Sequence, residues 1–390
     1  MKRVRMVLDP AVPADLVGEV RERLVYAWER IREHQLADDG ATLDLTIDDD
    51  ADSAEAEQRV RSFVAPMVKR HPAVERVVVF EHRVRPAYSS PIASELEARR
   101  AVILAQHGQA TLTEDAVDVL EALDRRFAAL ARDVFAAKSH YYPTMIATSS
   151  LDRIQYFASF PHHVTFAFPL REDVDVIQNV AKESVTFDSN DFLGLLRKPA
   201  QVLTPAACFN TYVHFQDRPL PEPTVITARV RCFRYESRNM TSLERLWEFA
   251  VREIVFLGPQ AWVEERRKMA VDAAARFVEE LGLDAWIETA NDPFFVNNFV
   301  ARRFFQLAQH TKYELRLGLP YAGDKSLAAA SFNLHLDFFG KGFGIARDDA
   351  FAFTGCVGFG LERWVWALFA QLGPRVRDWP VSVRRALALE

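Results

Sequence analysis

The sequence predicts an α+β protein, in which a small α/β domain precedes a larger domain built on an antiparallel sheet flanked by helices. Strand-like and helical patterns alternate over residues 1–85. A strand–loop–strand pattern spans residues 231–258, and a glycine-rich run leads into an apolar helix over residues 355–369. We therefore expect a small domain of unknown role at residues 1–85 and a second domain at residues 95–380.

The first domain is expected to contain two helices and three strands. Its expected elements, in chain order, are a strand at 4–8, a helix at 13–36, a strand at 42–47, a helix at 53–70 that Pro66 ends or kinks, and a strand at 77–80. The acidic run at residues 48–52 lacks the glycine and the terminal glutamate of a calcium loop, so we interpret it as solvated turn acids.

A linker rich in proline and serine over residues 86–97 is expected to lead into the second domain. Thr111-Leu-Thr-Glu114 offers capping side chains for a helix. The expected elements are helices at 96–107 and 115–137, a strand at 164–170, the hairpin at 231–258, a helix at 262–281 ended by Gly282, strands at 312–317, 328–336 and 351–353, and the helix at 355–369.

The hairpin carries the first chemical signal. Arg234 and Glu236 alternate along its first strand, so they are expected on one face, beneath an unusually long loop. A guanidinium binds phosphate bidentately and a carboxylate accepts a hydrogen bond from an amino group, so the pair suits a nucleotide. The alternative is a surface strand with an ion pair.

The glycine-rich run carries the second signal. Gly358-Phe-Gly-Leu-Glu-Arg363 places Arg363 near the start of the apolar helix, where free backbone N–H groups favour anions. The alternative is a pair of packing glycines before a core helix.

Composition restricts the classes of function. The net charge of −6 argues against a large phosphate-binding surface, although it allows a local basic patch. The sequence contains no apolar run of membrane-spanning length, and its start lacks the apolar core of a signal peptide, so we expect a cytoplasmic protein. Cys208, Cys232 and Cys356 lie far apart without a C-x-x-C pair, so spacing alone proposes no metal site.

Short motifs give the chain a family resemblance. Phe233-Arg-Tyr-Glu236 and Gly358-Phe-Gly-Leu-Glu-Arg363 resemble motifs 2 and 3 of class II aminoacyl-tRNA synthetases, in the right order. Further segments resemble the amino acid:[carrier protein] ligases, relatives of the archaeal-type seryl-tRNA synthetase catalytic domain. These segments are Thr204-Pro-Ala-Ala-Cys208, Asn291-Asp-Pro-Phe-Phe295, Lys312-Tyr-Glu-Leu315, Ser331-Phe-Asn-Leu-His335 and Thr354-Gly-Cys-Val-Gly358. The resemblance covers residues 95–375, leaving the N-terminal domain outside it.

The resemblance implies a class II synthetase-like antiparallel sheet that binds a bent ATP. Arg234 would hold the α-phosphate and Arg363 the γ-phosphate, with Arg234 and Arg363 the catalytic pair. Glu236 would accept from the adenine amino group and Phe249 would stack on the ring. Mg²⁺ would accompany ATP, but Leu327 stands where seryl-tRNA synthetases place an acidic residue, with Asp324 three residues earlier.

The resemblance also implies a catalytic zinc site. Cys208, Glu253 and Cys356 match the three protein ligands of Zn²⁺ in the carrier-protein ligases, where the fourth position takes the substrate amine. Without the resemblance, each cysteine would be interpreted as a buried small hydrophobe, as Cys232 is. The resemblance assigns substrate binding to Glu314, Asn333 and His335, with a wall at residues 357–359, whereas His162 and His163 are interpreted as structural.

The expected function is ATP-dependent activation of a small amino acid and its transfer to the phosphopantetheine thiol of a carrier protein, by a homodimer. A seryl-type aminoacyl-tRNA synthetase is the alternative, and tRNA is disfavoured because no long heptad-patterned arm precedes the catalytic region. A non-catalytic paralogue acting as a binding module is a third possibility. It is disfavoured because the nucleotide-binding and zinc-binding residues are all retained.

Overall fold

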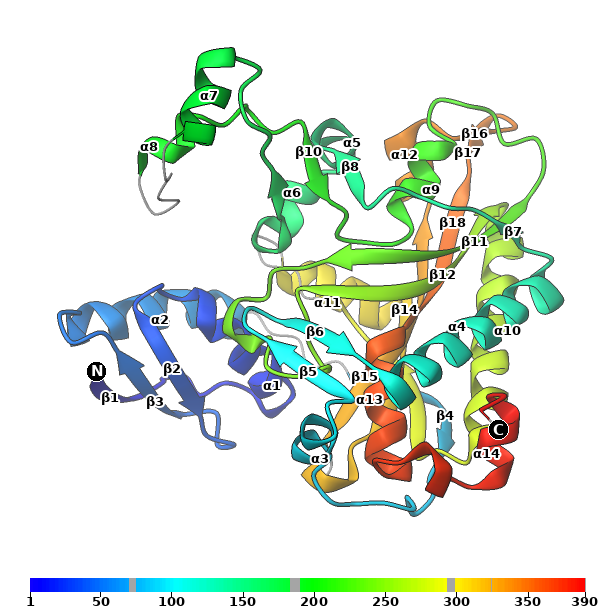
Figure 1. Cartoon of the computed structure of the whole chain (residues 1–390), viewed down its shortest axis with the longest axis horizontal. Coiled ribbons are helices and arrows are strands. Elements are labelled where there is room, and N and C mark those ends of the chain that lie inside the picture. Colours follow the sequence, from blue (N-terminus) through cyan, green and yellow to red (C-terminus); the bar gives the residue numbers. More distant parts are fainter. Residues whose placement is uncertain (70–74, 183–189, 293–298, 324, 390) are drawn as a thin grey trace.

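The chain folds around one large antiparallel sheet, as the α+β prediction requires. The computed structural model describes residues 1–69, 75–182, 190–292, 299–323 and 325–389. The large sheet has eight strands in the order β4-β13-β14-β15-β18-β12-β11-β7, and only the short β7 runs parallel to its neighbour. Its strands are β4 (Val78–His82), β7 (Lys138–Ser139), β11 (Thr224–Phe233), β12 (Glu248–Gly258), β13 (Ala285–Thr289), β14 (Lys312–Gly318), β15 (Ser326–Leu336) and β18 (Phe353–Gly360). Figure 1 shows this sheet beside a smaller N-terminal unit in blue.

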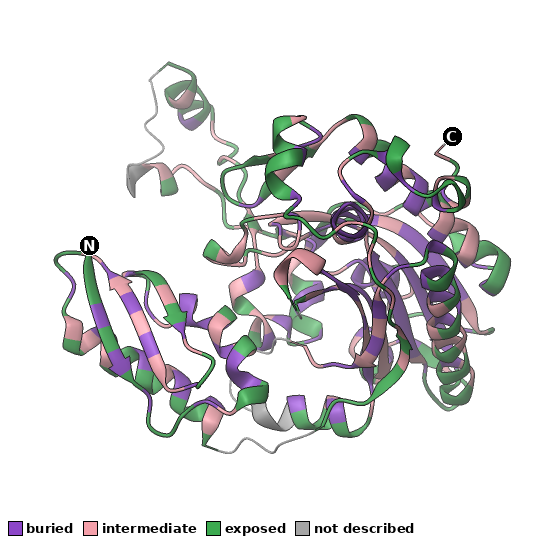
Figure 2. Ribbon diagram, turned by 90° about the horizontal axis from the view of Figure 1, so that it is seen from below, coloured by how far each residue is buried: buried purple, intermediate pink, exposed green. Residues whose placement is uncertain are grey.

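Three helices cover one face of the large sheet and enclose the main core. These helices are α4 (Glu114–Phe135), α10 (Gln260–Leu281) and α13 (Leu361–Leu372). Phe127 of α4 stacks on Phe359 of β18 with ring centroids 4.1 Å apart, and Trp364 of α13 is fully buried beside it. Figure 2 shows the buried residues concentrated along these strands and helices. Within the described ranges, no helix is both long and apolar enough to cross a membrane.

Short elements complete the second domain, mostly around the opposite face and the edges of the sheet. The helices are α3 (Ala93–Ala98), α5 (Thr148–Arg153), α6 (Tyr156–Ser159), α7 (Val174–Lys182), α8 (Asn190–Leu193), α9 (Phe209–His214), α11 (Phe299–Ala308), α12 (Phe338–Phe343) and α14 (Val381–Ala386). The strands are β5 (Val102–Ala105), β6 (Gln109–Leu112), β8 (Met145–Ala147), β9 (Phe166–Ala167), β10 (Gln201–Leu203), β16 (Ala346–Arg347) and β17 (Ala350–Phe351). The 3₁₀ turns of this domain are η2 (Pro161–His163), η3 (Ser237–Asn239), η4 (Pro320–Ala322) and η5 (Val376–Asp378), whereas η1 (Leu24–Tyr26) belongs to the N-terminal unit.

The N-terminal unit (residues 1–69) has its own three-stranded sheet and its own core. Its elements are β1 (Lys2–Val7), α1 (Ala14–Arg23), β2 (Ile31–Leu36), β3 (Thr42–Ile47) and α2 (Ser53–Val68). Two of the turn acids have partners within the protein: Asp48 pairs with Arg32, and Asp52 caps α2 by accepting from the Ala54 N–H at 2.9 Å.

Two sequence predictions for this region are wrong. The helix expected at 13–36 ends after η1, and residues 31–36 form β2 because Ile31 and Leu36 bury against the unit's own core. The strand expected at 77–80 forms as β4, but it pairs with β13 at the edge of the large sheet and belongs to that sheet.

The prediction of a helix at 96–107 is also wrong, except at its start. Helix α3 ends at Ala98, and β5 and β6 form a hairpin whose turn places His107 and Gly108 at positive φ. Thr113 does precede helix α4, but its hydroxyl donates to the carbonyl of Arg100 and caps nothing. The strand expected at 164–170 shrinks to β9, which pairs with β10 outside the large sheet.

We predict that Phe127→Ala lowers the free energy of unfolding by about 3–5 kcal/mol, because it empties a fully packed aromatic site. Equilibrium urea unfolding measures the change. The matched control is Val117→Ala on the exposed side of the same helix, which should change stability by less than about 0.5 kcal/mol. Equal effects of the two substitutions would contradict the core assignment.

Candidate active site

The face of the large sheet that α4, α10 and α13 do not cover holds a cavity of about 300 Å³. All ten residues singled out from the sequence line it. They are Cys208, Arg234, Glu236, Phe249, Glu253, Glu314, Asn333, His335, Cys356 and Arg363. The structure therefore brings together residues that span more than a hundred and fifty positions of the sequence.

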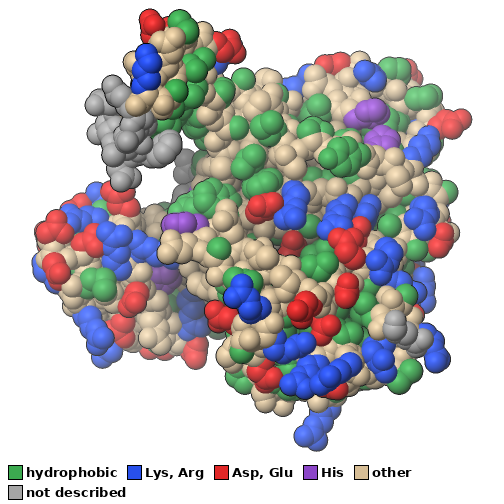
Figure 3. All heavy atoms as spheres, viewed as in Figure 1, with side chains coloured by type: hydrophobic (Ala, Val, Ile, Leu, Met, Phe, Trp, Pro, Cys, Tyr) green, Lys and Arg blue, Asp and Glu red, His purple; other side chains and the backbone are tan. Residues whose placement is uncertain are grey.

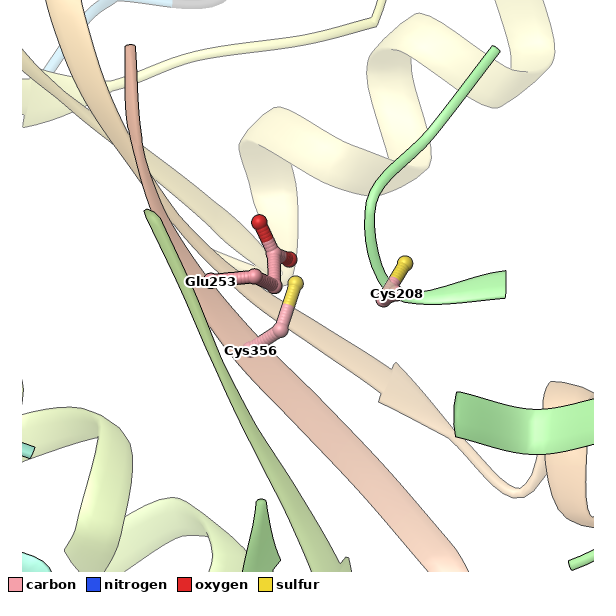
Figure 4. Close-up of side chains that lie close together, drawn as sticks. All are labelled: Cys208, Glu253 and Cys356. Atoms are coloured by element: carbon pink, nitrogen blue, oxygen red, sulfur yellow. The ribbon is translucent and has the colours of Figure 1, made fainter. Parts of the chain in front are cut away.

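At one end of the cavity, two thiols and a carboxylate form a compact buried cluster. The ligand atoms of Cys208, Glu253 and Cys356 all lie within 4.8 Å of one another. Glu253 comes from β12, Cys356 from the adjacent β18, and Cys208 from the turn before α9 (Figure 4). Two sulfurs and one oxygen are a donor set that zinc accepts, and three protein ligands leave room for a fourth.

The electrostatics of this cluster favour a cation. Burial raises the pKa of Glu253 to about 7. Hydrogen bonding with Cys208, together with burial, raises the pKa of the Cys356 thiol well above its ordinary value. Three acidic groups buried together are costly to ionise unless a positive charge lies among them. The chemistry of the donor set therefore fits a divalent metal.

Strand register explains why these two strands supply neighbouring ligands. Cys356 is paired with Val255, and Glu253 is paired with Gly358, so the thiol and the carboxylate lie diagonally on one face. A Cβ at residue 358 would lie 2.6 Å from the Glu253 carboxylate. The glycine of the Gly-x-Gly motif thus makes room for a cluster ligand.

A second layer of polar groups orients the cluster. Asn333 Nδ2 lies 3.5 Å from Cys356 Sγ and donates to it. His335 Nε2 lies 3.7 Å from the same sulfur, while its Nδ1 lies 3.2 Å from the Tyr212 hydroxyl. Burial lowers the pKa of His335 to about 4, so the imidazole is neutral at pH 7. These contacts resemble the outer-layer hydrogen bonds that hold metal ligands.

The arginine and the carboxylate of the hairpin also line the cavity. Strand β11 ends at Phe233, so Arg234 and Glu236 lie at the start of the loop and not on the strand as predicted. Arg234 Nε donates to the Pro205 carbonyl at 2.8 Å, and its guanidinium lies 5.5 Å from the Phe249 ring centroid. Glu236 accepts from Arg245.

Arg363 lies in the first turn of α13, as predicted. Its Nε donates to the Glu244 carbonyl at 2.8 Å and its Nη1 donates to the Ala328 carbonyl at 3.0 Å. The neighbouring Glu362 is buried and accepts from the Ala250 N–H, which ties the start of α13 to β12. These hydrogen bonds hold the start of α13 and the Arg363 guanidinium beside the cavity.

Sequence reasoning missed several residues of the cavity wall. Lys312 is buried and pairs with Asp292 at 2.6 Å and with Glu314 at 3.2 Å. Burial opposes ionisation of Asp292, but the Lys312 ammonium lowers the pKa of that carboxyl overall. The i, i+2 spacing of Lys312 and Glu314 on one strand could have indicated this pair. His163 also lines the cavity, whereas a structural role was predicted for it from the sequence.

One expectation for the cavity fails, and two positions singled out from the sequence lie outside the described residues. Val357 and Phe359 pack toward the helices, so Gly358 alone of residues 357–359 lines the cavity. Leu327 is buried in the main core and offers no metal ligand. Asp324 and the Pro-Phe-Phe part of the 291–295 motif lie outside the described residues.

Comparison with known proteins identifies the family. No family model matches the chain. Amino acid–[acyl-carrier-protein] ligase 1 of Bradyrhizobium diazoefficiens is 31% identical over 253 residues, which are 64% of this chain and 76% of that protein. The chain belongs to this family. A type-2 serine–tRNA ligase of Methanococcus maripaludis is 29% identical over 254 residues, 63% of this chain and 49% of that protein, so the chain spans about half of that relative's length.

The fold of the family is that of class II seryl-tRNA synthetases. The M. kandleri enzyme, in a crystal structure with tRNASec from A. aeolicus, matches 99% of this chain and 77% of its own, with a TM-score of 0.74 and 24% identity. Because the match spans nearly the whole chain, the N-terminal unit lies inside the structural likeness. The expectation that it lies outside the resemblance is wrong at the level of fold.

We predict that the purified protein contains about one zinc per chain and that Cys356→Ser loses it, because a hydroxyl is a poor zinc ligand. Elemental analysis after dialysis measures the zinc. Cys232→Ser is the matched control, since Cys232 is equally buried on the neighbouring strand and lies outside the cluster. A metal-free wild-type protein with full activity would end the assignment.

Proposed function

We propose that this ligase activates a small amino acid with ATP to form an aminoacyl-AMP and transfers the aminoacyl group to the phosphopantetheine thiol of a carrier protein. The supporting observation is that a single cavity joins two groups of residues. One group is Arg234, Glu236 and Arg363, and the other is the Cys208–Glu253–Cys356 cluster.

The nucleotide half of the proposal assigns each residue by its chemistry. Arg234, stacked on Phe249, would hold the α-phosphate, and Arg363 would hold the γ-phosphate of a bent ATP. Glu236 would accept from the adenine amino group, and Phe249 would present its ring to the base. Mg²⁺ bound with ATP, and assembly as a homodimer, stay predictions.

Adenylation requires little covalent chemistry from the protein. The substrate carboxylate oxygen forms a bond to the α-phosphorus while the bond to the departing pyrophosphate breaks, in line. The protein must align the two reactants and neutralise charge on the phosphates. The two arginines do both, so no side-chain nucleophile is needed.

The amino acid half depends on the buried cluster. Cys208, Glu253 and Cys356 would hold Zn²⁺, which when bound would supply a Lewis acid for the neutral α-amine of the substrate. Asn333 and His335 would steady the Cys356 thiolate, and Glu314, held by Lys312, would face the bound amino acid. A substrate without an α-amine would lack this anchor.

A tRNA acceptor is the second candidate, and most of the comparisons favour it. The Methanococcus maripaludis relative is a serine–tRNA ligase, and the M. kandleri enzyme was crystallised with tRNA. The missing heptad arm counts less against tRNA, because that tRNA-bound enzyme shares the fold of 99% of this chain.

The charge of the N-terminal unit supports the carrier protein over tRNA. Residues 1–69 contain ten Lys and Arg against fifteen Asp and Glu, a formal net charge of −5. Figure 3 shows charges of both signs mixed over this unit, without a broad basic face in that view. Binding of a polyanion depends on clustered Lys and Arg, and the net negative charge of this unit opposes it.

We predict that amino-acid-dependent exchange of pyrophosphate into ATP is strongest with one small amino acid, weaker with its nearest homologue, and absent with phenylalanine or glycolate. One methylene changes binding by only about 1–3 kcal/mol, so glycine, alanine and serine should be incompletely separated. Phenylalanine fails on size and glycolate fails because it has no amine. Strong turnover of glycolate would refute amine anchoring, whereas strong turnover of phenylalanine would refute only the size limit.

We predict that the activated amino acid forms a thioester with a holo carrier protein and is not transferred to tRNA. Acid-stable labelling of the carrier protein, reversed by hydroxylamine, measures the thioester. The apo carrier protein, which has no phosphopantetheine thiol, is the control. Charging of tRNA without thioester formation would establish the second candidate instead.

A further inference from the structure

The hairpin loop (residues 234–247) organises the nucleotide half of the cavity. It carries Glu236, and its Glu244 carbonyl accepts from Arg363 Nε at 2.8 Å. Its two ends are tied together where the Arg234 N–H donates to the Trp247 carbonyl at 2.8 Å. The position of this loop therefore decides where two of the groups proposed to bind ATP lie.

The N-terminal unit holds this loop through several hydrogen bonds. Asn239 Nδ2 donates to the Glu22 carbonyl at 2.8 Å, and Arg238 donates to the Ile31 carbonyl. The Tyr26 hydroxyl donates to the Tyr235 carbonyl at 3.4 Å. Figure 1 shows the loop, in light green, reaching the blue unit. The contacts involve α1, η1 and β2 of the unit, so its folded structure supports the loop.

One arginine connects the unit to the cavity directly. Arg245 Nη1 donates to the Glu236 carboxylate, while its Nη2 donates to the Glu22 carboxylate at 2.7 Å. The planar guanidinium can bind two carboxylates at once in a fixed geometry. Glu236 and Arg245 both line the cavity. Without Glu22, the Arg245 guanidinium would bind Glu236 as its one remaining carboxylate partner. The Glu236 carboxylate would then be less free to accept a hydrogen bond from a nucleobase.

We propose that the N-terminal unit completes the nucleotide site, with Glu22 acting through Arg245 as a positioning residue for Glu236. This inference rests on the proposed role of Glu236 in ATP binding. The N-terminal unit would then contribute to formation of the aminoacyl-AMP, the step that precedes transfer to an acceptor.

A second contact allows Glu22 to be tested without detaching the unit. Arg303 of α11, which is 2% exposed, lies 3.2 Å from Asp15 and 3.6 Å from Glu19 on α1. These pairs are independent of Glu22 and stay intact when it is replaced. A loss of ATP affinity in a Glu22 variant would then report the link through Arg245.

The test measures ATP binding by calorimetry and the KM for ATP in pyrophosphate exchange. Glu22→Gln should raise both about three- to tenfold, as expected for one lost charge-assisted hydrogen bond, with kcat changed less than about twofold. Glu22→Asp, which keeps the charge, should recover most of the affinity. Asp38→Asn, which breaks an exposed pair with Arg21 in the same unit, is the control and should leave both constants unchanged.

A double-mutant cycle tests the path. If Glu22 acts through Arg245, Glu22→Gln should add nothing in an Arg245→Met background. Unchanged ATP affinity in Glu22→Gln, or effects of the two substitutions that multiply independently, would overturn the inference while the proposed function stands. A wild-type chain that binds no ATP would overturn both.

Discussion

The antiparallel pairing of β12 with β18 is the constraint on which the rest of the molecule depends. Alternation along these strands sends Ile254, Phe256, Val357 and Phe359 into the core beneath the helices. The intervening positions send Glu253 and Cys356 to the opposite face. A shift of one residue in this pairing would exchange the two faces, exposing core side chains and burying the cluster among helices. Core packing therefore enforces the register that the chemistry needs.

The cost of burying acidic groups shapes two clusters in the cavity. Burial raises the pKa of Glu253, and hydrogen bonding with Cys208 raises that of the Cys356 thiol, whereas the Lys312 ammonium, against the effect of burial, lowers the pKa of Asp292 and Glu314. The Asp292–Lys312–Glu314 cluster thus contains its own cation, whereas the donor set of the Cys208–Glu253–Cys356 cluster suits an added one. A single cavity therefore combines a polar cluster whose charges are already paired with a cluster that depends on a metal.

The N-terminal unit stabilises a loop of the catalytic domain. Its hydrogen bonds to the hairpin loop replace solvent around a segment that has little regular structure of its own. Long loops hold a defined conformation only where other elements contact them, and this loop is contacted by the unit on one side and by the β5–β6 turn on the other. The order of the loop is thereby linked to the fold of a separate unit.

Local alternation and short motifs were enough to predict the α+β class, the long hairpin, and a nucleotide-binding role for Arg234, Glu236 and Arg363. The ligands of the buried cluster were predicted only through the family resemblance. The sequence also placed Arg363 at the start of its helix, since the glycine-rich approach and the apolar run are contiguous. The helices predicted over residues 31–36 and 102–107 are wrong, because their apolar spacing suits a helix until neighbouring strands are present to pair with them. Three further points became visible in the folded chain alone: β4 belongs to the large sheet, residues 357 and 359 face away from the cavity, and Arg245 joins Glu22 to Glu236. These depend on contacts between segments far apart in the chain, which local periodicity cannot encode.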